Sequence, residues 1–281
     1  MKKILFLFVC LLISKVSLAD NVILMIGDGM GENHLKCASA DKAIYIMTLP
    51  IKGWVHTHSA NNQITDSAAS ATAYACGEKT NNRMLGKFAG GDDCQTIAEK
   101  AVQEGLSVGI YSTDYATGAT PSAFFAHVYN RNDRKTIASY KLRAQNVMDI
   151  KVPVSKISQE VEAALNKLKN NTKGFFAMFE GALIDTYSHH NKLDKMKEEL
   201  YDFDLAVKFA SDFVRENPDT TLIVLADHET GGLSDECRYT QKSHSGTDVP
   251  VYADGKHAEL FDGKQDNIEI YKKMYQILFE N

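Results

Sequence analysis

The chain has 281 residues, of which 24% are charged, and its formal net charge is −5. This length is sufficient for one large domain with a sizeable core, and the absence of a basic stripe excludes nucleic acid as the main partner. Beyond the N-terminus no apolar run reaches the eighteen or so residues that a membrane span requires, so we expect no transmembrane helix and no membrane partner.

The first segment of the chain has the pattern of a signal peptide. Lys2 and Lys3 precede a ten-residue apolar run over 4–13, and Ser17 and Ala19 form a small-x-small cleavage site. The apolar run is too short to span a bilayer. We therefore expect residues 1–19 to be removed, which places the protein in the periplasm or outside the cell. No internal repeat or linker divides residues 20–281, so we expect them to form a single domain.

The remaining chain alternates strand and helix patterns. Continuous apolar runs predict buried strands over 21–26, 106–112, 175–179 and 221–226. Helical patterns are found over 32–45, 66–75, 96–104, 159–169, 193–216 and 267–279. Strands that alternate with helices predict an α/β fold, a three-layer sandwich with a mostly parallel central sheet and helices on both faces.

Cysteine usage fits an exported protein. Four cysteines remain after the signal segment: Cys37, Cys76, Cys94 and Cys237. They allow three complete pairings, and none has the CxxC spacing of zinc ligands. Because Cys76 and Cys94 bracket a loop that contains Gly and Asn, the sequence favours a disulfide between these two.

Polar side chains suited to metal binding follow each of the four predicted strands. Asp28 follows the first, Thr120 the loop after the second, Glu180 ends the third, and Asp227 with His228 ends the fourth. In open α/β sheets ligands bind outside the carboxyl ends of the strands. We therefore expect these side chains to meet at one edge of the sheet.

Two further motifs suggest chemistry at that edge. Ser67 follows an aspartate and opens a helix of small residues, where backbone N–H groups and the helix dipole favour an anion. Asp185 and His189 are four residues apart and share a face of a helix or wide turn. Together with a distant histidine they would form a zinc site of two nitrogens and a carboxylate. The ordinary alternative for Ser67 is a helix cap with a small-residue packing face.

Other histidines have no carboxylate partner at a strand end. A lone histidine is usually exposed or a satisfied core residue, and we expect this of His34, His56, His58, His190 and His257. His127 lies within the apolar stretch 124–128, which favours a packing role.

Seven stretches of the chain occur in the same order in the alkaline phosphatases. They are NVILMIGDGMG (21–31), ITDSAASAT (64–72), ATPS (119–122), AHVYNR (126–131), EGALID (180–185), ADH (226–228) and HSGTDVPVYA (244–253). On these motifs residues 20–281 resemble a bacterial-type alkaline phosphatase catalytic domain over nearly their whole length.

The resemblance implies a role for each matching residue. Ser67 would be the nucleophile that becomes phosphorylated, and Arg131 would clamp the phosphate. The resemblance implies two Zn²⁺ and one Mg²⁺ per chain, with ligands Asp185, His189 and His244 for one zinc, Asp28, Asp227 and His228 for the other, and Asp28, Thr120 and Glu180 for magnesium. The chemistry of each set agrees, since zinc accepts mixed nitrogen and oxygen ligands whereas magnesium prefers oxygen alone.

The function implied is that of an exported phosphomonoesterase working through a phosphoserine. One alternative is a phosphodiesterase of the same superfamily, which Arg131, His244 and the magnesium ligands disfavour. Another is a catalytically silent zinc- or phosphate-binding protein, which would be expected to lack a nucleophile or a ligand. Members of the family are often dimers, and a homodimer is left open here.

The chain also departs from the family pattern. Only 48 residues separate Arg131 from Glu180, and 15 separate His228 from His244. Many relatives carry longer segments there. Gly118 and Thr186 occupy positions where many members have a charged or aromatic residue, so we expect weaker magnesium binding than where an aspartate assists.

Overall fold

A computed structural model describes residues 20–280, so the expected signal peptide lies outside the described residues. Their main sheet has eight strands in the order β10-β2-β9-β6-β1-β5-β3-β4. The strands are β1 (Asn21–Gly27), β2 (Ile51–His56), β3 (Ser107–Ser112), β4 (Asp149–Lys151), β5 (Phe175–Gly181), β6 (Thr220–Leu225), β9 (Val249–Gly255) and β10 (Gly263–Asp266). A separate two-stranded ribbon pairs β7 (Glu229–Thr230) with β8 (His244–Ser245).

The centre of the sheet is parallel and largely buried. Strands β6, β1, β5, β3 and β4 run in one direction, whereas β9 is antiparallel to both of its neighbours. Every residue of β5 and β6 is buried, as expected for strands covered on both faces. The four strands predicted from the sequence are therefore adjacent, and their carboxyl ends lie at the same edge.

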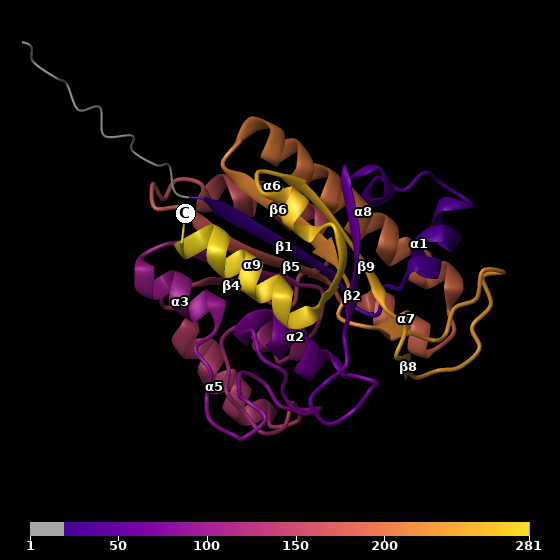
Figure 1. The fold of residues 1–281 in the computed structure, drawn as a ribbon, viewed down its shortest axis with the longest axis horizontal. Helices are drawn as coiled ribbons and strands as arrows, with labels where there is room; N and C mark the ends of the chain where they lie inside the picture. The colour runs from indigo at the N-terminus through magenta and orange to yellow at the C-terminus, as the bar shows by residue number, and fades with distance from the viewer. Residues whose placement is uncertain (1–19, 281) are drawn as a thin grey trace, which may run out of the picture.

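Helices cover both faces of the sheet. They are α1 (Glu32–Ser39), α2 (Ser67–Cys76), α3 (Ile97–Glu104), α4 (Ala119–Ser122), α5 (Arg134–Ala144), α6 (Ser158–Leu168), α7 (Leu183–His189), α8 (Leu193–Glu216) and α9 (Asn267–Phe279), with 3₁₀ turns over Ile46–Thr48 and Ala258–Phe261. Helices α6 and α8 pack together against one face, and α9 lies across the other beside α2 and α3 (Figure 1). This is the predicted three-layer α/β fold.

One predicted helix is shorter than expected. The pattern over 32–45 predicted a continuous helix, but α1 ends at Ser39. The carboxylate of Asp204 accepts hydrogen bonds from the N–H groups of Tyr45 and Ile46, at 3.0 and 2.9 Å. These contacts from the distant helix α8 hold the chain in a turn where local propensity alone would continue the helix.

The residues that the structure describes contain two disulfides. Cys76 and Cys94 are bonded, as the sequence favoured, with their Cα atoms 6.0 Å apart. The remaining pair, Cys37 and Cys237, joins α1 to the loop after β7, with Cα atoms 5.6 Å apart. Among residues 20–280, no helix combines the length and apolar character needed to cross a bilayer.

Candidate active site

The hydroxyl of Ser67 lies at the start of helix α2, beside an imidazole. Asp66 caps this helix, and its carboxylate accepts a hydrogen bond of 3.0 Å from the N–H of Ala69. Ser67 is 3% exposed, and its Oγ lies 3.2 Å from Nε2 of His228. All ten residues of α2 are buried, and Gly77 ends the helix with a φ of 75°. The small side chains thus let α2 pack tightly and fix the position of its first hydroxyl.

Asp66 also connects the helix to Arg131. Its Oδ2 lies 3.4 Å from Nη1 of Arg131 in an ion pair, while both of its oxygens accept from the N–H of Arg83. The backbone N–H of Arg131 donates to the carbonyl of Arg83 at 2.7 Å. The carboxylate of Asp66 therefore fixes the position of Arg131 relative to the start of helix α2. From the sequence, Asp66 could be recognised only as the acidic neighbour of Ser67.

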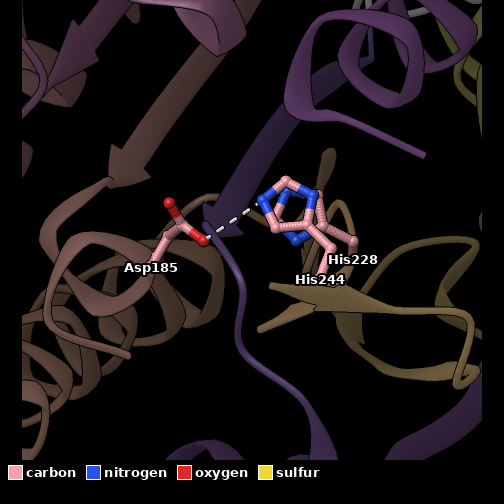
Figure 2. Close-up of side chains that lie close together, drawn as sticks. All are labelled: Asp185, His228 and His244. Carbon is pink, nitrogen blue, oxygen red and sulfur yellow. Dashed lines mark ion pairs between the residues drawn. The ribbon is translucent and has the colours of Figure 1, made fainter. Parts of the chain in front are cut away.

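A first cluster of metal-type ligands joins α7 to the β8 strand. Oδ1 of Asp185 lies 3.3 Å from Nε2 of His189 on the same helix and 3.7 Å from Nε2 of His244. The two histidine Nε2 atoms are 3.1 Å apart. Figure 2 shows Asp185 facing His244, whose ring stacks on that of His228 with centroids 3.6 Å apart. The predicted first ligand set is therefore brought together, and His228 lies against it.

A second cluster is centred on Nε2 of His228. Oδ2 of Asp227 lies 3.3 Å from this nitrogen and Oδ1 of Asp28 lies 3.5 Å away. The three residues are buried, and their ligand atoms lie within 4.8 Å of one another. Neither of these two carboxylate oxygens has a hydrogen-bond partner. Buried polar atoms are nearly always partnered, so these oxygens have the chemistry of a cation site.

The three histidines share one tautomer. Nδ1 of His189 faces the carbonyl of Lys242 at 2.5 Å, and Nδ1 of His244 faces the carbonyl of Thr65 at 2.9 Å. A carbonyl only accepts, so in the neutral imidazole each Nδ1 carries the hydrogen and each Nε2 presents a lone pair.

Thr230 fixes the same tautomer for His228. Its hydroxyl donates to Oδ1 of Asp185 at 2.5 Å, so it accepts from Nδ1 of His228 at 3.2 Å. An N–H bonded to a protein acceptor opposite the ligating nitrogen is the usual arrangement of metal-ligating histidines.

Thr230 was not identified from the sequence. A Cβ on Gly29 would come within 2.8 Å of the Thr230 hydroxyl oxygen, and Gly29 has a φ of 70°. The glycine after Asp28 therefore lets the β1 loop approach this threonine.

A third cluster contains oxygen atoms only. Oε1 of Glu180 and Oγ1 of Thr120 are buried without a hydrogen-bond partner, as is Oδ1 of Asp28. We call Asp28, Thr120 and Glu180 the oxygen cluster. The hydroxyl of Ser112 donates to the other carboxylate oxygen of Glu180. Three orphaned oxygens and no nitrogen fit a hard cation such as Mg²⁺.

The electrostatics of the site call for positive charge. Burial, followed by the charges of Asp227 and Asp185, raises the pKa of Asp28 well above its usual range. Burial and the charge of Asp114 do the same for the pKa of Glu180. Burial, then the charge of His244, lowers the pKa of His228 well below its usual range. Bound cations would lower the pKa values of these carboxylates and so oppose the effect of burial, and they would further favour the neutral imidazole of His228.

The other histidines do not join these clusters. His34 is buried in α1, with Nε2 3.0 Å from the hydroxyl oxygen of Ser188. His127 contacts Glu99 through Nε2 at 2.8 Å and the carbonyl of Gly86 through Nδ1. His56 and His257 have carboxylate neighbours of their own, in Asp248 and Asp20. These are satisfied core or surface contacts, as expected.

Comparison with known proteins agrees with this geometry. The family model described as alkaline phosphatase matches residues 19–156, 140–240 and 234–279. The chain belongs to the alkaline phosphatase family. It is 27% identical to alkaline phosphatase 4 of Bacillus subtilis over 76% of this chain and 62% of that protein, and 30% identical to the alkaline phosphatase of Schizosaccharomyces pombe over 76% and 56%. The chain thus matches about three-fifths of the length of these two relatives.

Solved structures of the family have the same fold over most of this chain. The alkaline phosphatase of the Antarctic bacterium TAB5 superposes with a TM-score of 0.85 at 26% identity, covering 93% of this chain and 98% of that one. A histidine-to-aspartate variant of the same enzyme, with a TM-score of 0.83, is described with Mg bound in its M3 site. The match therefore includes nearly all of the TAB5 enzyme and most of the present chain.

Proposed function

We propose that this chain is an exported, metal-dependent phosphomonoesterase that releases inorganic phosphate through a phosphoserine at Ser67. The observation that carries the proposal is the convergence of three imidazole lone pairs on the carboxylates next to one buried serine hydroxyl. Family membership supports phosphoester hydrolysis. The eight-stranded sheet and its continuous core support residues 20–281 as one catalytic domain.

Three cations fit the clusters. We assign zinc to the two clusters that contain histidine: Asp185, His189 and His244 in the first, and Asp28, Asp227 and His228 in the second. We assign Mg²⁺ to the oxygen cluster, and the magnesium in the M3 site of the TAB5 variant supports this choice. When bound, these ions supply Lewis-acid stabilisation of the attacking and leaving oxygens and neutralise the buried carboxylates.

Residues of the chain account for the remaining steps. Arg131 binds two phosphate oxygens through its planar guanidinium, which the ion pair with Asp66 orients. The Ser67 oxygen attacks phosphorus in line with the ester oxygen, the P–O bond to the alcohol breaks, and the alcohol leaves with a proton. Water then attacks the phosphoserine and the serine P–O bond breaks, which releases phosphate and restores the hydroxyl.

The substrate class follows from the contacts. The clusters and Arg131 act on the phosphoryl group, and only 15 residues lie between His228 and His244 to build a covering segment. We infer that many phosphomonoesters serve as substrates. A phosphodiesterase would have to accommodate a second ester group beside Arg131, and Asp66 already occupies one side of this guanidinium.

The decisive experiment compares the rates of hydrolysis of a chromogenic phosphomonoester and of the matching diester. The zinc content of the same protein sample is measured by elemental analysis. We expect monoester hydrolysis at the higher rate, loss of turnover with chelator, and recovery with zinc plus magnesium. A higher rate on the diester would favour the phosphodiesterase. Zinc binding without turnover of either compound would favour a binding protein.

A further inference from the structure

Asp114 is a carboxylate beside the candidate site that neither the family motifs nor the predicted ligand sets include. It lies two residues beyond the end of β3, and β3 pairs with β5 so that Ser112 is opposite Glu180. The carboxyl ends of these strands lie at the edge that carries the clusters. Asp114 is half-buried, and no ion pair partners it among the described residues.

One hydroxyl connects Asp114 to the oxygen cluster. The backbone N–H of Asp114 donates to Oγ of Ser112 at 2.8 Å, and the Ser112 hydroxyl donates to Glu180. The Asp114 side chain accepts a hydrogen bond of 2.7 Å from the N–H of Tyr115, and it does so through Oδ1 rather than Oδ2. The loop conformation is therefore fixed by the same hydroxyl that orients Glu180.

Gly118 provides the space for the Asp114 carboxylate. A Cβ built on Gly118 would overlap the Asp114 carboxylate, whose Cβ would lie 2.8 Å away. Gly118 immediately precedes α4, the short helix that carries Thr120. The carboxylate of Asp114 thus occupies the position from which a side chain at residue 118 would project.

The surrounding charges define what Asp114 can do. Glu180 and Asp185 are its acidic neighbours, and Arg131 and Arg134 are its basic ones. The buried oxygens of Glu180, Thr120 and Asp28 are unpartnered, which is an independent sign of a cation. Because the oxygen cluster supplies three protein residues and Mg²⁺ takes six oxygen ligands in an octahedron, a bound Mg²⁺ would keep part of its water shell.

We propose that Asp114 is a positioning residue of the oxygen cluster, where its carboxylate accepts hydrogen bonds from the water shell of Mg²⁺ and adds a negative charge that favours this ion. The inference rests on the proposed function, since it takes the oxygen cluster to be a cation site. It also changes the expectation from the sequence: Gly118 supplies no charge itself, but the space it leaves admits one from Asp114. A carboxylate added at residue 118 alone would displace Asp114.

The test measures Mg²⁺ affinity in zinc-loaded full-length protein by calorimetry, and Mn²⁺ binding by its paramagnetic resonance. Asp114→Asn should raise the Kd for Mg²⁺ tenfold or more, as removal of groups around metal ligands typically does, with the zinc content unchanged. Asp262→Asn is the matched control, because Oδ1 of Asp262 also accepts from the next N–H in an exposed turn. Its Kd should equal that of the unmodified protein.

A double variant moves the carboxylate. Asp114→Ala combined with Gly118→Asp should recover most of the Mg²⁺ affinity lost in Asp114→Ala, because the new side chain projects into the vacated space. Suppose that the unmodified protein binds zinc and hydrolyses the monoester. A Kd for Mg²⁺ in Asp114→Asn within twofold of the unmodified value would then overturn this inference but leave the proposed function standing. Lack of Mg²⁺ and Mn²⁺ binding in the unmodified protein would overturn it together with the third metal site.

Discussion

His189 and His244 present their Nε2 atoms to each other across 3.1 Å, and in the neutral imidazoles both of these nitrogens carry lone pairs. Nδ1 of His189 donates a hydrogen bond to the backbone carbonyl of Lys242, and Nδ1 of His244 donates one to the backbone carbonyl of Thr65. Two lone pairs at this distance repel unless a cation lies between them. The contact therefore has the geometry of two ligands that share an ion.

Removal of His189 should cost one zinc. We expect His189→Ala to lower the zinc content from two ions per chain to one and to reduce turnover strongly, because two ligands hold zinc poorly. Elemental analysis of dialysed protein provides the measurement. His190→Ala is the matched control, since His190 is the exposed neighbour whose Nδ1 also contacts a backbone carbonyl, that of Thr186. Unchanged zinc content in His189→Ala would contradict the assignment.

Ser67→Ala should abolish the covalent intermediate but leave the metals bound. We expect a loss of at least several kcal/mol of transition-state stabilisation, on the order of a thousandfold in rate, partly offset if water takes the place of the hydroxyl. In the unmodified protein, acid quenching after incubation with labelled phosphate should label a peptide that contains Ser67. The same peptide contains Ser70, whose hydroxyl donates to the carbonyl of Asp227 at 2.7 Å. Label on Ser70 would refute the nucleophile assignment.

The hydroxyl of Thr230 should tune zinc affinity without contacting the ion. Thr230→Val keeps the shape but removes both the acceptor for His228 and the donor to Asp185. We expect zinc affinity to fall roughly 10- to 100-fold, the usual effect of such outer partners. Competition with a chromophoric chelator measures it. Thr240→Val, which removes a hydroxyl bonded to the carbonyl of Gly232 in an exposed loop, should have no effect. Equal affinities for both variants would mean that Thr230 does not orient the ligands.

Much of this architecture could be predicted from the sequence because it depends on local patterns. The central strands are long apolar runs, and α8 and α9 begin and end at the predicted residues. The antiparallel edge was not predicted. Strand β2 mixes Lys52 and His56 with apolar residues, and helix α5 buries only Ile137. Such segments have weak periodicity, and distant neighbours decide their structure.

The same distinction between local patterns and distant contacts applies to the residues of the site. Strand-end ligands could be found because parallel strands carry their carboxyl ends to one edge. The contacts of Asp66 with Arg131, of Thr230 with His228, and of Asp114 with the space at Gly118 could not. Each depends on where loops from separate strands meet. The sequence shows which residues such a loop contains but not which neighbour they contact.

His34 should make the protein less stable in acid. Burial lowers its pKa from 6.5 to about 4. Between pH 6.5 and pH 4 this imidazole is protonated in the unfolded chain but neutral in the folded one. Stability is therefore unaffected above pH 6.5, falls as the pH drops towards 4, and is lower by about 2 kcal/mol at pH 5. His34→Gln should reduce the difference in unfolding free energy between pH 7 and pH 5 by this amount.

His127 offers a control of opposite sign. Burial opposes the charge on this imidazole, but hydrogen bonds to Glu99 and to the carbonyl of Gly86 outweigh it and raise its pKa. It therefore stabilises the fold at acidic pH, and this contribution is lost as the pH rises through the folded pKa. His127→Gln should enlarge the difference that His34→Gln reduces. Changes of the same sign in both variants would show that the two environments are misassigned.

A common phosphoserine has a kinetic consequence for substrates with different alcohols. If its breakdown or phosphate release limits turnover, kcat should be nearly the same for aryl and alkyl phosphates, because the alcohol has already left. Rapid mixing with an aryl phosphate should show a burst of one alcohol per active site, followed by the steady rate. Leaving groups that span a wide range of pKa provide the series, and each kcat is measured at saturation. A steep fall of kcat with rising leaving-group pKa, without a burst, would mean that attack by Ser67 is the slow step and would contradict the shared limiting step.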